Sequence, residues 1–473
     1  MWRRCFFAWL TGFGQHERNQ RETVTRHLLL GAFEVNALNI SSQGLWARPD
    51  HDSTEYKHLS RWTRLAQMLD RGGFDFLFLA DTYGYPLLSG EVPAVAIEQA
   101  VDLPKNDPLL LIPALAAVTE RLSFAVTSST TYEEPFANAR RFATLDHLTG
   151  GRVAWNVVTS SSVAATQLFG RDGLIAHDQR YEIASEYMDL SYKLLEGSWE
   201  DDAVKADKVG RVYADPDKVH VVEHEGKYFK CKGVFCCEPS PQRTPVIFQA
   251  GASKAGRGFA ARHAEVVFLQ GSDTESLRNQ VTSIRQAAEE HGRDPRDIKT
   301  VVGLSAIAAD SRAEAEAQLE DYLSYAHQQA ARVYYAMMTG VDLAKLEADG
   351  AMSELRTELG QTQLERYAKK SAADAYADFS KRGLREFIML GTGGEIAEQL
   401  AELVEETDVD GINFAPFANP GSYENFIDRV VPELRDLELL PTEPSGPKTF
   451  REGLFGQAHA KKTHPAAQYR VGK

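Results

Sequence analysis

Eight short runs of apolar residues recur along the chain, and segments with helical periodicity separate them. The runs are nearly continuous rather than alternating in polarity, which is typical of strands buried on both faces of a parallel sheet. The segments between them repeat apolar residues at steps of three and four, as between residues 183 and 194, and predict helices. Eight strands, each followed by a helix, predict a (β/α)₈ barrel with insertions. The runs cover residues 28–36, 74–81, 122–130, 152–160, 246–253, 264–271, 301–308 and 409–417.

An open doubly wound α/β sheet is the alternative architecture. Such a sheet usually carries the dinucleotide-binding fingerprint GxGxxG after a strand. The nearest match, residues 391–394, has Ile396 where the third glycine belongs. The barrel is therefore the preferred prediction.

Two segments interrupt the alternation of strand and helix. Residues 198–244 contain a predicted hairpin that turns near Gly226, and residues 328–385 are mostly helical in pattern. Long additions to a barrel are usually lids or oligomer contacts. We expect both segments to be insertions into the barrel.

The two ends of the chain are expected to lie outside the barrel proper. Residues 1–26 predict a disordered N-terminal extension, because Glu17 and Glu22 argue against an organelle-targeting peptide. The barrel with its insertions is expected over residues 27–440, and residues 441–473 form a C-terminal tail.

Charge and cysteine usage restrict the class of partner. The chain has 473 residues, a net charge of −15 and 25% charged residues, which argues against nucleic acid or an anionic membrane as a partner. No apolar stretch is long enough to span a membrane. The four cysteines show no CxxC pair and no metal-ligand spacing, so we expect a cytoplasmic protein without a metal.

Polar side chains end most of the apolar runs. In a barrel of this kind the chemistry lies at the carboxyl ends of the strands, so these side chains should line its mouth. They include no pair of carboxylates, no Ser/His/Asp set and no metal cluster, which suggests that a cofactor carries the reaction. The residues are Asn36, Asp81, Thr127, Ser128, Ser129, Thr159, Ser160, Ser161, Gly251, Ser253 and Gln270.

The stretch from 245 to 265 predicts a strand, a tight turn and the start of a helix. Gly251 permits close approach of the backbone to a ligand, and Ser253 is a natural helix N-cap. The first N–H groups of the helix and its dipole favour an anion there. The turn is a candidate phosphate site, although an ordinary capped turn has the same pattern.

Four longer motifs resemble one enzyme family. TLDHLTGGRVAWNVVTS (144–160), EGSWEDDAVKADK (196–208), CEPSPQRTPVIFQAGAS (237–253) and THPAAQYR (463–470) resemble flavin-dependent monooxygenases of the nitrilotriacetate, dibenzothiophene sulfone, dimethyl sulfide and long-chain alkane group. That group belongs to the bacterial luciferase-like superfamily. The resemblance implies a (β/α)₈ barrel and a homo-oligomer, dimer or tetramer.

The same resemblance implies the cofactor and the reaction. Reduced FMN (FMNH₂) would come from a separate NAD(P)H:flavin reductase, react with O₂ to a C4a-hydroperoxyflavin, and insert one oxygen atom into an organic substrate. Carried over by position, the flavin site comprises Asp81, Ser160, Ser161, Tyr181, Ala250, Gly251, Ala252 and Ser253. Thr127 joins them as a polar residue at a strand end. Asp81 as a helix cap and Tyr181 as a core aromatic are the structural alternatives.

Three positions depart from the alkane-oxidising relatives. Ala37, Ile40 and Ser161 occupy the places where those relatives carry a Cys and two His, so the catalytic residues are unknown. Two other functions stay open: an oxidoreductase of the same superfamily that uses the deazaflavin F420, and a non-enzymatic flavin-binding protein.

The loops expected at the mouth predict the substrate class. They contain aromatic and aliphatic residues without Lys or Arg, which favours a small, neutral, largely apolar or organosulfur substrate. The 328–385 insertion could change this prediction by bringing Arg332 or Lys345 over the mouth.

Overall fold

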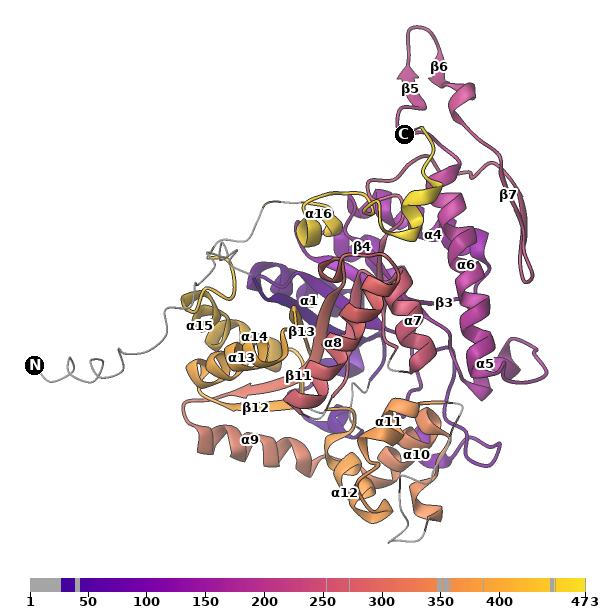
Figure 1. Cartoon of the computed structure of the whole chain (residues 1–473). Coiled ribbons are helices and arrows are strands. Elements are labelled where there is room, and N and C mark those ends of the chain that lie inside the picture. The colour runs from indigo at the N-terminus through magenta and orange to yellow at the C-terminus, as the bar shows by residue number, and fades with distance from the viewer. Residues whose placement is uncertain are drawn as a thin grey trace, which may run out of the picture.

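The computed structural model describes residues 27–38, 43–251, 253–271, 273–346, 352, 357, 359–385, 387–442, 446 and 448–472. The predicted N-terminal extension therefore lies outside the described residues. At the centre is a parallel sheet with eight strands that correspond to the eight apolar runs (Figure 1). They are β1 (Leu29–Val35), β2 (Phe76–Ala80), β3 (Ser123–Ser129), β4 (Val153–Val158), β9 (Val246–Gln249), β10 (Val266–Leu269), β11 (Lys299–Ala308) and β13 (Gly411–Phe414).

The sheet closes on itself. The strand order is β10-β9-β4-β3-β2-β1-β13-β11, and β10 also pairs with β11, so each of the eight strands has two parallel neighbours. A closed parallel sheet with helices outside is the (β/α)₈ barrel. The predicted barrel is confirmed, and the open doubly wound sheet is excluded.

Helices surround the barrel where the periodicity predicted them. The helix expected from residue 183 onwards is part of α6, which ends at Gly197. In α8 the apolar residues Leu277, Val281, Ile284 and Ala288 follow the same periodicity. Their apolar faces pack on the outward side chains of the strands in one large core cluster. The helices around the barrel are α1 (Leu59–Gly72), α2 (Ala94–Glu98), α3 (Ile112–Ala116), α4 (Pro135–Thr149), α5 (Val163–Leu168), α6 (His177–Gly197), α7 (Lys254–His263), α8 (Thr274–Glu290), α13 (Gly393–Thr407), α14 (Gly421–Arg429) and α15 (Val431–Asp436).

A ninth strand was not predicted. β12 (Phe387–Gly391) runs parallel to the second half of β11, from Leu304 to Ala308, beyond the part of β11 that pairs with β10 and β13. Its side chains are mostly half-buried, so the segment lacks the continuous buried pattern of the barrel strands.

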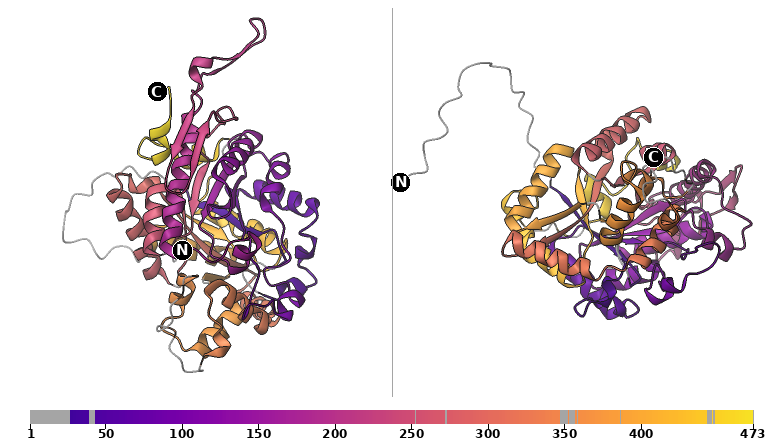
Figure 2. Two further views of the ribbon diagram at one scale, coloured as in Figure 1. Left: turned by 90° about the vertical axis from the view of Figure 1, so that its right-hand side faces the viewer. Right: turned by 90° about the horizontal axis from the view of Figure 1, so that it is seen from below.

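The first insertion forms two antiparallel hairpins. β7 (Val222–Glu225) pairs with β8 (Lys230–Gly233), and the N–H of Gly226 donates to the Phe229 carbonyl at 2.9 Å, which confirms the predicted turn. β5 (Val204–Asp207) and β6 (Val212–Ala214) form a second hairpin that projects away from the barrel (Figure 2).

The second insertion is helical and lies at one end of the barrel. After α9 (Arg312–Ser324) come α10 (Gln328–Thr339), α11 (Gln361–Arg366) and α12 (Ala372–Arg382). They pack around a small apolar core of their own that includes Tyr335 and Phe379. Figure 1 shows α10 to α12 at the end of the barrel opposite to α16 (Phe450–Phe455).

The segment expected as a C-terminal tail is built into the fold. The ring of Phe450 lies 5.9 Å from the rings of both Phe76 and Phe248 inside the barrel, at the end where the strands begin. Arg451 is fully buried, and its Nη2 donates to the Glu265 carboxylate at 2.8 Å. These contacts close the N-terminal end of the barrel.

Candidate active site

A large cavity opens at the carboxyl ends of β9 and β10. Its volume is about 980 Å³, which suits a cofactor or drug-sized ligand. Gly251 and Gln270 line it from the barrel, Ser276 and Gln280 from α8, and Arg366 from the helical insertion. The insertion thus forms one wall of the cavity.

The predicted phosphate turn faces this cavity. Ser253 is the N-cap of α7, and its Oγ accepts a hydrogen bond from the Gly256 N–H at 3.1 Å. Gly251 is buried and lines the cavity, and Ala250 is exposed there. Ala252, the remaining predicted residue of the turn, lies outside the described residues.

Tyr181 meets the same turn from α6. Burial raises the pKa of its hydroxyl, while hydrogen bonds with Ser253 and Thr159 act in the opposite direction. A Cβ added to Gly256 would lie 2.8 Å from the Tyr181 Oη, so the glycine makes room for the tyrosine. Tyr181 is therefore a half-buried part of the turn and not merely a core aromatic.

Ser160 adopts a backbone conformation that is rare for a residue other than glycine. Its φ is 26°, and its Oγ donates to the Ser129 Oγ at 2.8 Å. Strained backbone of this kind is often found at ligand sites. Ser161 follows it and is half-buried.

Thr127 uses its hydroxyl inside the barrel. The Oγ1 donates to the Leu79 carbonyl at 3.0 Å and accepts from the Asn156 Nδ2 at 2.9 Å. The residue is buried, and these bonds link β2, β3 and β4. The contacts of Thr127 are therefore those of the barrel wall.

Asp81 directly follows β2 at the mouth. Burial raises the pKa of its carboxyl to about 7, with Lys105 lowering it and Asp107 raising it further. The carboxyl therefore titrates near neutral pH. Strongly perturbed pKa values cluster at functional sites, and Asp81 stands at the end of the barrel where such sites lie.

The positions that depart from alkane-oxidising relatives are only partly described. Ala37 is buried and forms a β-bridge with Lys105, while Ile40 lies outside the described residues. Neither Ala37 nor Ser161 offers a group that titrates near neutral pH.

The helical insertion brings cations to the cavity, but not the two that were named from the sequence. Arg332 pairs with Asp342 at 2.7 Å, and Lys345 donates to the Ser89 hydroxyl at 3.2 Å. The cavity is lined instead by Lys369 and by three further cations of the insertion that share one carboxylate, Asp378. They are Arg366, Lys370 and Arg382, at 3.4, 3.6 and 3.8 Å from it.

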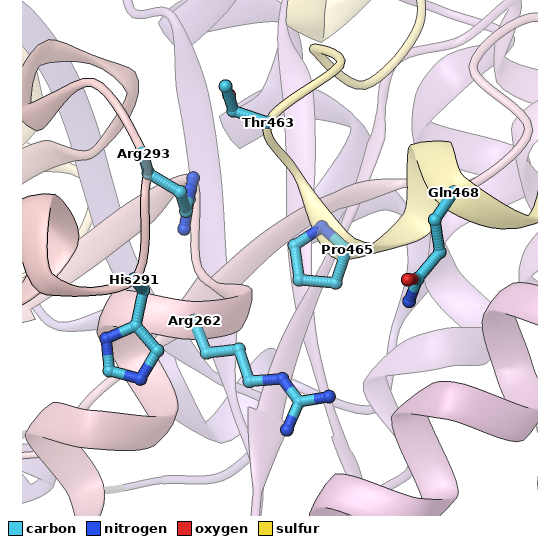
Figure 3. A pocket seen from close by; sticks show the side chains of 6 residues that line it. All are labelled: Arg262, His291, Arg293, Thr463, Pro465 and Gln468. Carbon is cyan, nitrogen blue, oxygen red and sulfur yellow. The ribbon is translucent and has the colours of Figure 1, made fainter.

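A second pocket, of about 330 Å³, lies beside the carboxyl end of α7, where β10 begins. Figure 3 shows the side chains that line it. Arg262, Arg293 and the C-terminal segment near Thr463 line it. Arg293 donates to the carbonyls of Ala261 and Ala264 at the end of α7, at 3.0 and 2.7 Å. Because this end of a barrel serves stability and Arg293 caps a helix, we do not assign the reaction to this pocket.

No metal site is found among the described residues, where no three His, Cys, Asp or Glu side chains form a group that could hold an ion. His220 pairs with Glu200 at 2.9 Å and His224 with Glu186 at 3.2 Å around the predicted hairpin. Within the described ranges no helix has the length and apolar character needed to cross a membrane.

Comparison with known proteins decides the family. The model of the luciferase-like monooxygenases matches residues 42–411. The chain belongs to the luciferase-like monooxygenase family. This monooxygenase is 42% identical over 450 residues to the long-chain alkane monooxygenase of Geobacillus thermodenitrificans, with 94% of this chain and 99% of that protein covered. It is 44% identical over 462 residues to the dimethyl-sulfide monooxygenase of Hyphomicrobium sulfonivorans, with coverages of 95% and 96%.

A solved structure agrees with both sequence comparisons. The crystal structure of riboflavin lyase, with modified FMN and its substrate riboflavin, superposes with a TM-score of 0.91 at 40% identity, covering 94% of this chain and 100% of that one. The luciferase-like monooxygenase described here is thus a flavin-dependent enzyme. The family favours this reading over the F420-dependent and non-enzymatic alternatives.

Several residues of the site escaped sequence analysis. Gln249, at the end of β9, hydrogen-bonds Tyr181 by its side chain, and Asp378 gathers the cations of the insertion. Gln249 had a detectable signal, because it follows an apolar strand as a polar residue. Asp378 had none, since its role depends on how the insertion folds back.

Proposed function

We propose that the chain is the oxygenase of a two-component system that uses FMNH₂ and O₂ to insert one oxygen atom into a small organic molecule. A separate NAD(P)H:flavin reductase would supply the reduced flavin. The observation that carries the proposal is the turn at the N-terminus of α7. There Tyr181 hydrogen-bonds Ser253, and the adjoining Ala250 and Gly251 line a cavity of about 980 Å³.

The residues present suit FMN. The Ser253 and Tyr181 hydroxyls and the first N–H groups of α7 would hold the phosphate, since all are donors at a positive helix end. Asp81 and Ser160 would contact the ring system from β2 and β4. Reduced FMN, when bound, supplies the chemistry that activates O₂.

The protein's own task is to bind, orient and exclude water. Burial of Ser129 and Asn156 inside the mouth and the wall formed by the helical insertion both restrict solvent. Asp81 is the group at the mouth whose pKa, about 7, lets it hold or release a proton at neutral pH.

The proposed substrate is neutral and largely apolar or organosulfur in character. Three of the four cations that line the cavity from the insertion contact Asp378, which reduces their attraction for an anionic substrate. The relatives named above act on alkanes, dimethyl sulfide and riboflavin, which are uncharged molecules. A cytoplasmic homo-oligomer stays part of the proposal.

The test is a turnover assay with ¹⁸O₂. The purified chain, FMN, NADH and an added flavin reductase are incubated with alkanes, thioethers, sulfones and nitrilotriacetate, and the products are read by mass spectrometry. We expect one ¹⁸O atom in the product of a neutral compound. Faster turnover of nitrilotriacetate than of every neutral compound would contradict the substrate class, and no labelled product with any compound would contradict the proposed reaction.

A further inference from the structure

A small side pocket adjoins the main cavity. Its volume is about 80 Å³, and both cavities are lined by Phe268, Leu269 and Gln270, so one opens beside the other. Phe33, Ser305 and Asn413 form its other walls within the barrel. The pocket is small beside the main cavity, so it suits the edge of a ligand whose body lies in the main cavity.

Asn413 points into the barrel. It is the third residue of β13, and its neighbours Ile412 and Phe414 belong to the core between the strands and the outer helices. Because successive side chains of a strand face opposite sides, Asn413 faces inward. Its side chain is fully buried, with an exposed fraction of 0%.

Neither polar atom of the Asn413 amide is hydrogen-bonded within the part of the chain that the structure describes. On the two adjacent strands the residues in register with it are Gly31 and Gly303, which have no side chain to offer. A buried amide without a partner is costly. The pocket therefore presents one donor and one acceptor, held side by side on a single side chain.

A group that satisfies both atoms must carry an acceptor beside a donor. The edge of a lactam, an imide or a carboxamide does so, because its carbonyl accepts from the Asn413 Nδ2 while its N–H donates to the Oδ1. Arg385 lines the same pocket, which favours a carbonyl oxygen there.

The pocket lies in the half of the barrel away from the proposed flavin residues. Asp81, Ser160 and Ala250 follow β2, β4 and β9, whereas the side pocket is walled by β1, β10, β11 and β13. If Asp81, Ser160 and Ala250 hold the flavin, the side pocket remains available to the substrate.

We propose that Asn413 is a specificity-determining residue that binds the lactam, imide or carboxamide edge of a ring-containing neutral substrate. The ring body lies in the main cavity, against Phe268. This inference rests on the proposed function, which it extends by naming the polar group that the substrate carries.

The test measures binding and not turnover. The full chain, loaded with oxidised FMN, is titrated by calorimetry with 2-quinolone, 1-methyl-2-quinolone and quinoline. The second probe lacks the N–H donor, and the third lacks the carbonyl as well. We expect 2-quinolone to bind at least tenfold more tightly than either of the others. Equal affinities of the wild-type protein for all three would overturn the proposal.

Two matched variants separate recognition from stability. Asn413→Leu should remove the preference for 2-quinolone and leave Tm unchanged or raised, because it replaces two unpaired polar atoms by apolar ones. Asn425→Leu is the control, since the Asn425 amide bonds the backbone of Ala308 at 3.1 and 2.8 Å. It should lower Tm and keep the preference.

The remaining outcomes also decide the question. An Asn413→Leu variant that fails to fold, or one that keeps the preference, would overturn the proposal. FMN has an imide edge of its own, so FMN affinity is measured in the same variant, and we expect a change of less than twofold. A tenfold loss of FMN affinity in Asn413→Leu, together with equal affinities of the wild-type protein for the three probes, would assign Asn413 to the cofactor. A lactam preference without oxygen insertion would contradict the proposed function alone.

Discussion

Ser253 combines two roles that one substitution can separate. Aspartate caps helices as well as serine does, so Ser253→Asp should keep the start of α7 intact. Its negative charge would lie beside a dianionic phosphate, at a cost of several kcal/mol at an effective dielectric constant of about 20. We expect FMN binding to be lost in a fluorescence titration while Tm stays within a few degrees.

Ser311 provides the control for that variant. It caps α9 in the same manner, by accepting from the Glu314 N–H at 3.3 Å. Ser311→Asp should bind FMN like the wild-type protein. Unchanged FMN affinity in Ser253→Asp would show that the phosphate lies elsewhere.

Asp81 makes stability depend on pH. Its pKa is about 7 in the folded protein, chiefly through burial, against about 3.9 in an unfolded chain. Between these values the folded protein holds a proton that the unfolded chain has released, so this residue's contribution to stability falls as the pH rises from 4 to 7. Asp81→Asn should therefore gain Tm relative to the wild-type protein as the pH increases.

The quantity to measure is the difference in Tm between Asp81→Asn and the wild-type protein at each pH. Glu34 and Asp75 also have raised pKa values, about 7 and about 6 through burial, and they are present in both. The Tm values of the two proteins should agree near pH 4 and differ above pH 7. There the difference in the free energy of unfolding should reach up to a few kcal/mol. Parallel curves would mean that the Asp81 carboxyl is not buried.

At the scale of elements, a buried ion pair between Arg451 and Glu265 helps to hold the C-terminal segment. Arg451 pairs with Glu265, whose pKa is lowered to about 2 because the attraction of Arg451 outweighs the effect of burial. Arg451→Met leaves that carboxylate buried without its partner, which costs about 3–5 kcal/mol. We expect a clear loss of Tm in calorimetry.

The second site of the pair supplies the check. Adding Glu265→Gln to Arg451→Met should restore part of the lost Tm, because no charge then stays buried. If the double variant is no more stable than the single one, the loss comes from packing of the segment and not from the ion pair.

The elements differ in how well the sequence predicted them. The eight barrel strands are buried on both faces, and that burial produces the continuous apolar runs. β12 pairs at the edge of β11 and keeps half-buried side chains, so its sequence carries a weaker pattern. The role of residues 448–472 could not be predicted, since it depends on contacts with Phe76 and Glu265, which are distant in sequence.

The residues of the candidate site also differ in how well the sequence predicted them. Ser253 was predicted as an N-cap from local sequence and is one. Asn413 lies within an apolar run and gave no signal, because its importance comes from Gly31 and Gly303 on the adjacent strands. Local rules predict caps and strands, whereas the pairing of buried polar groups depends on the closed barrel.

At the scale of the whole molecule, the proposed need for a separate flavin reductase can be tested. Two capped turns of the described residues border the large cavity, with Ser253 capping α7 and Asp273 capping α8. We assign the Ser253 turn to FMN, because the Asp273 carboxylate would repel a phosphate. The pure chain should therefore not oxidise NADH steadily, even with FMN present. Absorbance at 340 nm should fall only after a flavin reductase is added, and steady NADH consumption without one would contradict the two-component assignment.

The position of the C-terminal residues has a consequence for how the chain is made. The last barrel strand, β13, joins β1 to β11, and Phe450 fills the barrel beneath Phe76 and Phe248. These pieces follow the other seven barrel strands in the chain, so before β13 is made the sheet is open along β1 and β11. The barrel cannot close before β13 has been made, and until then the open edge can pair with another chain.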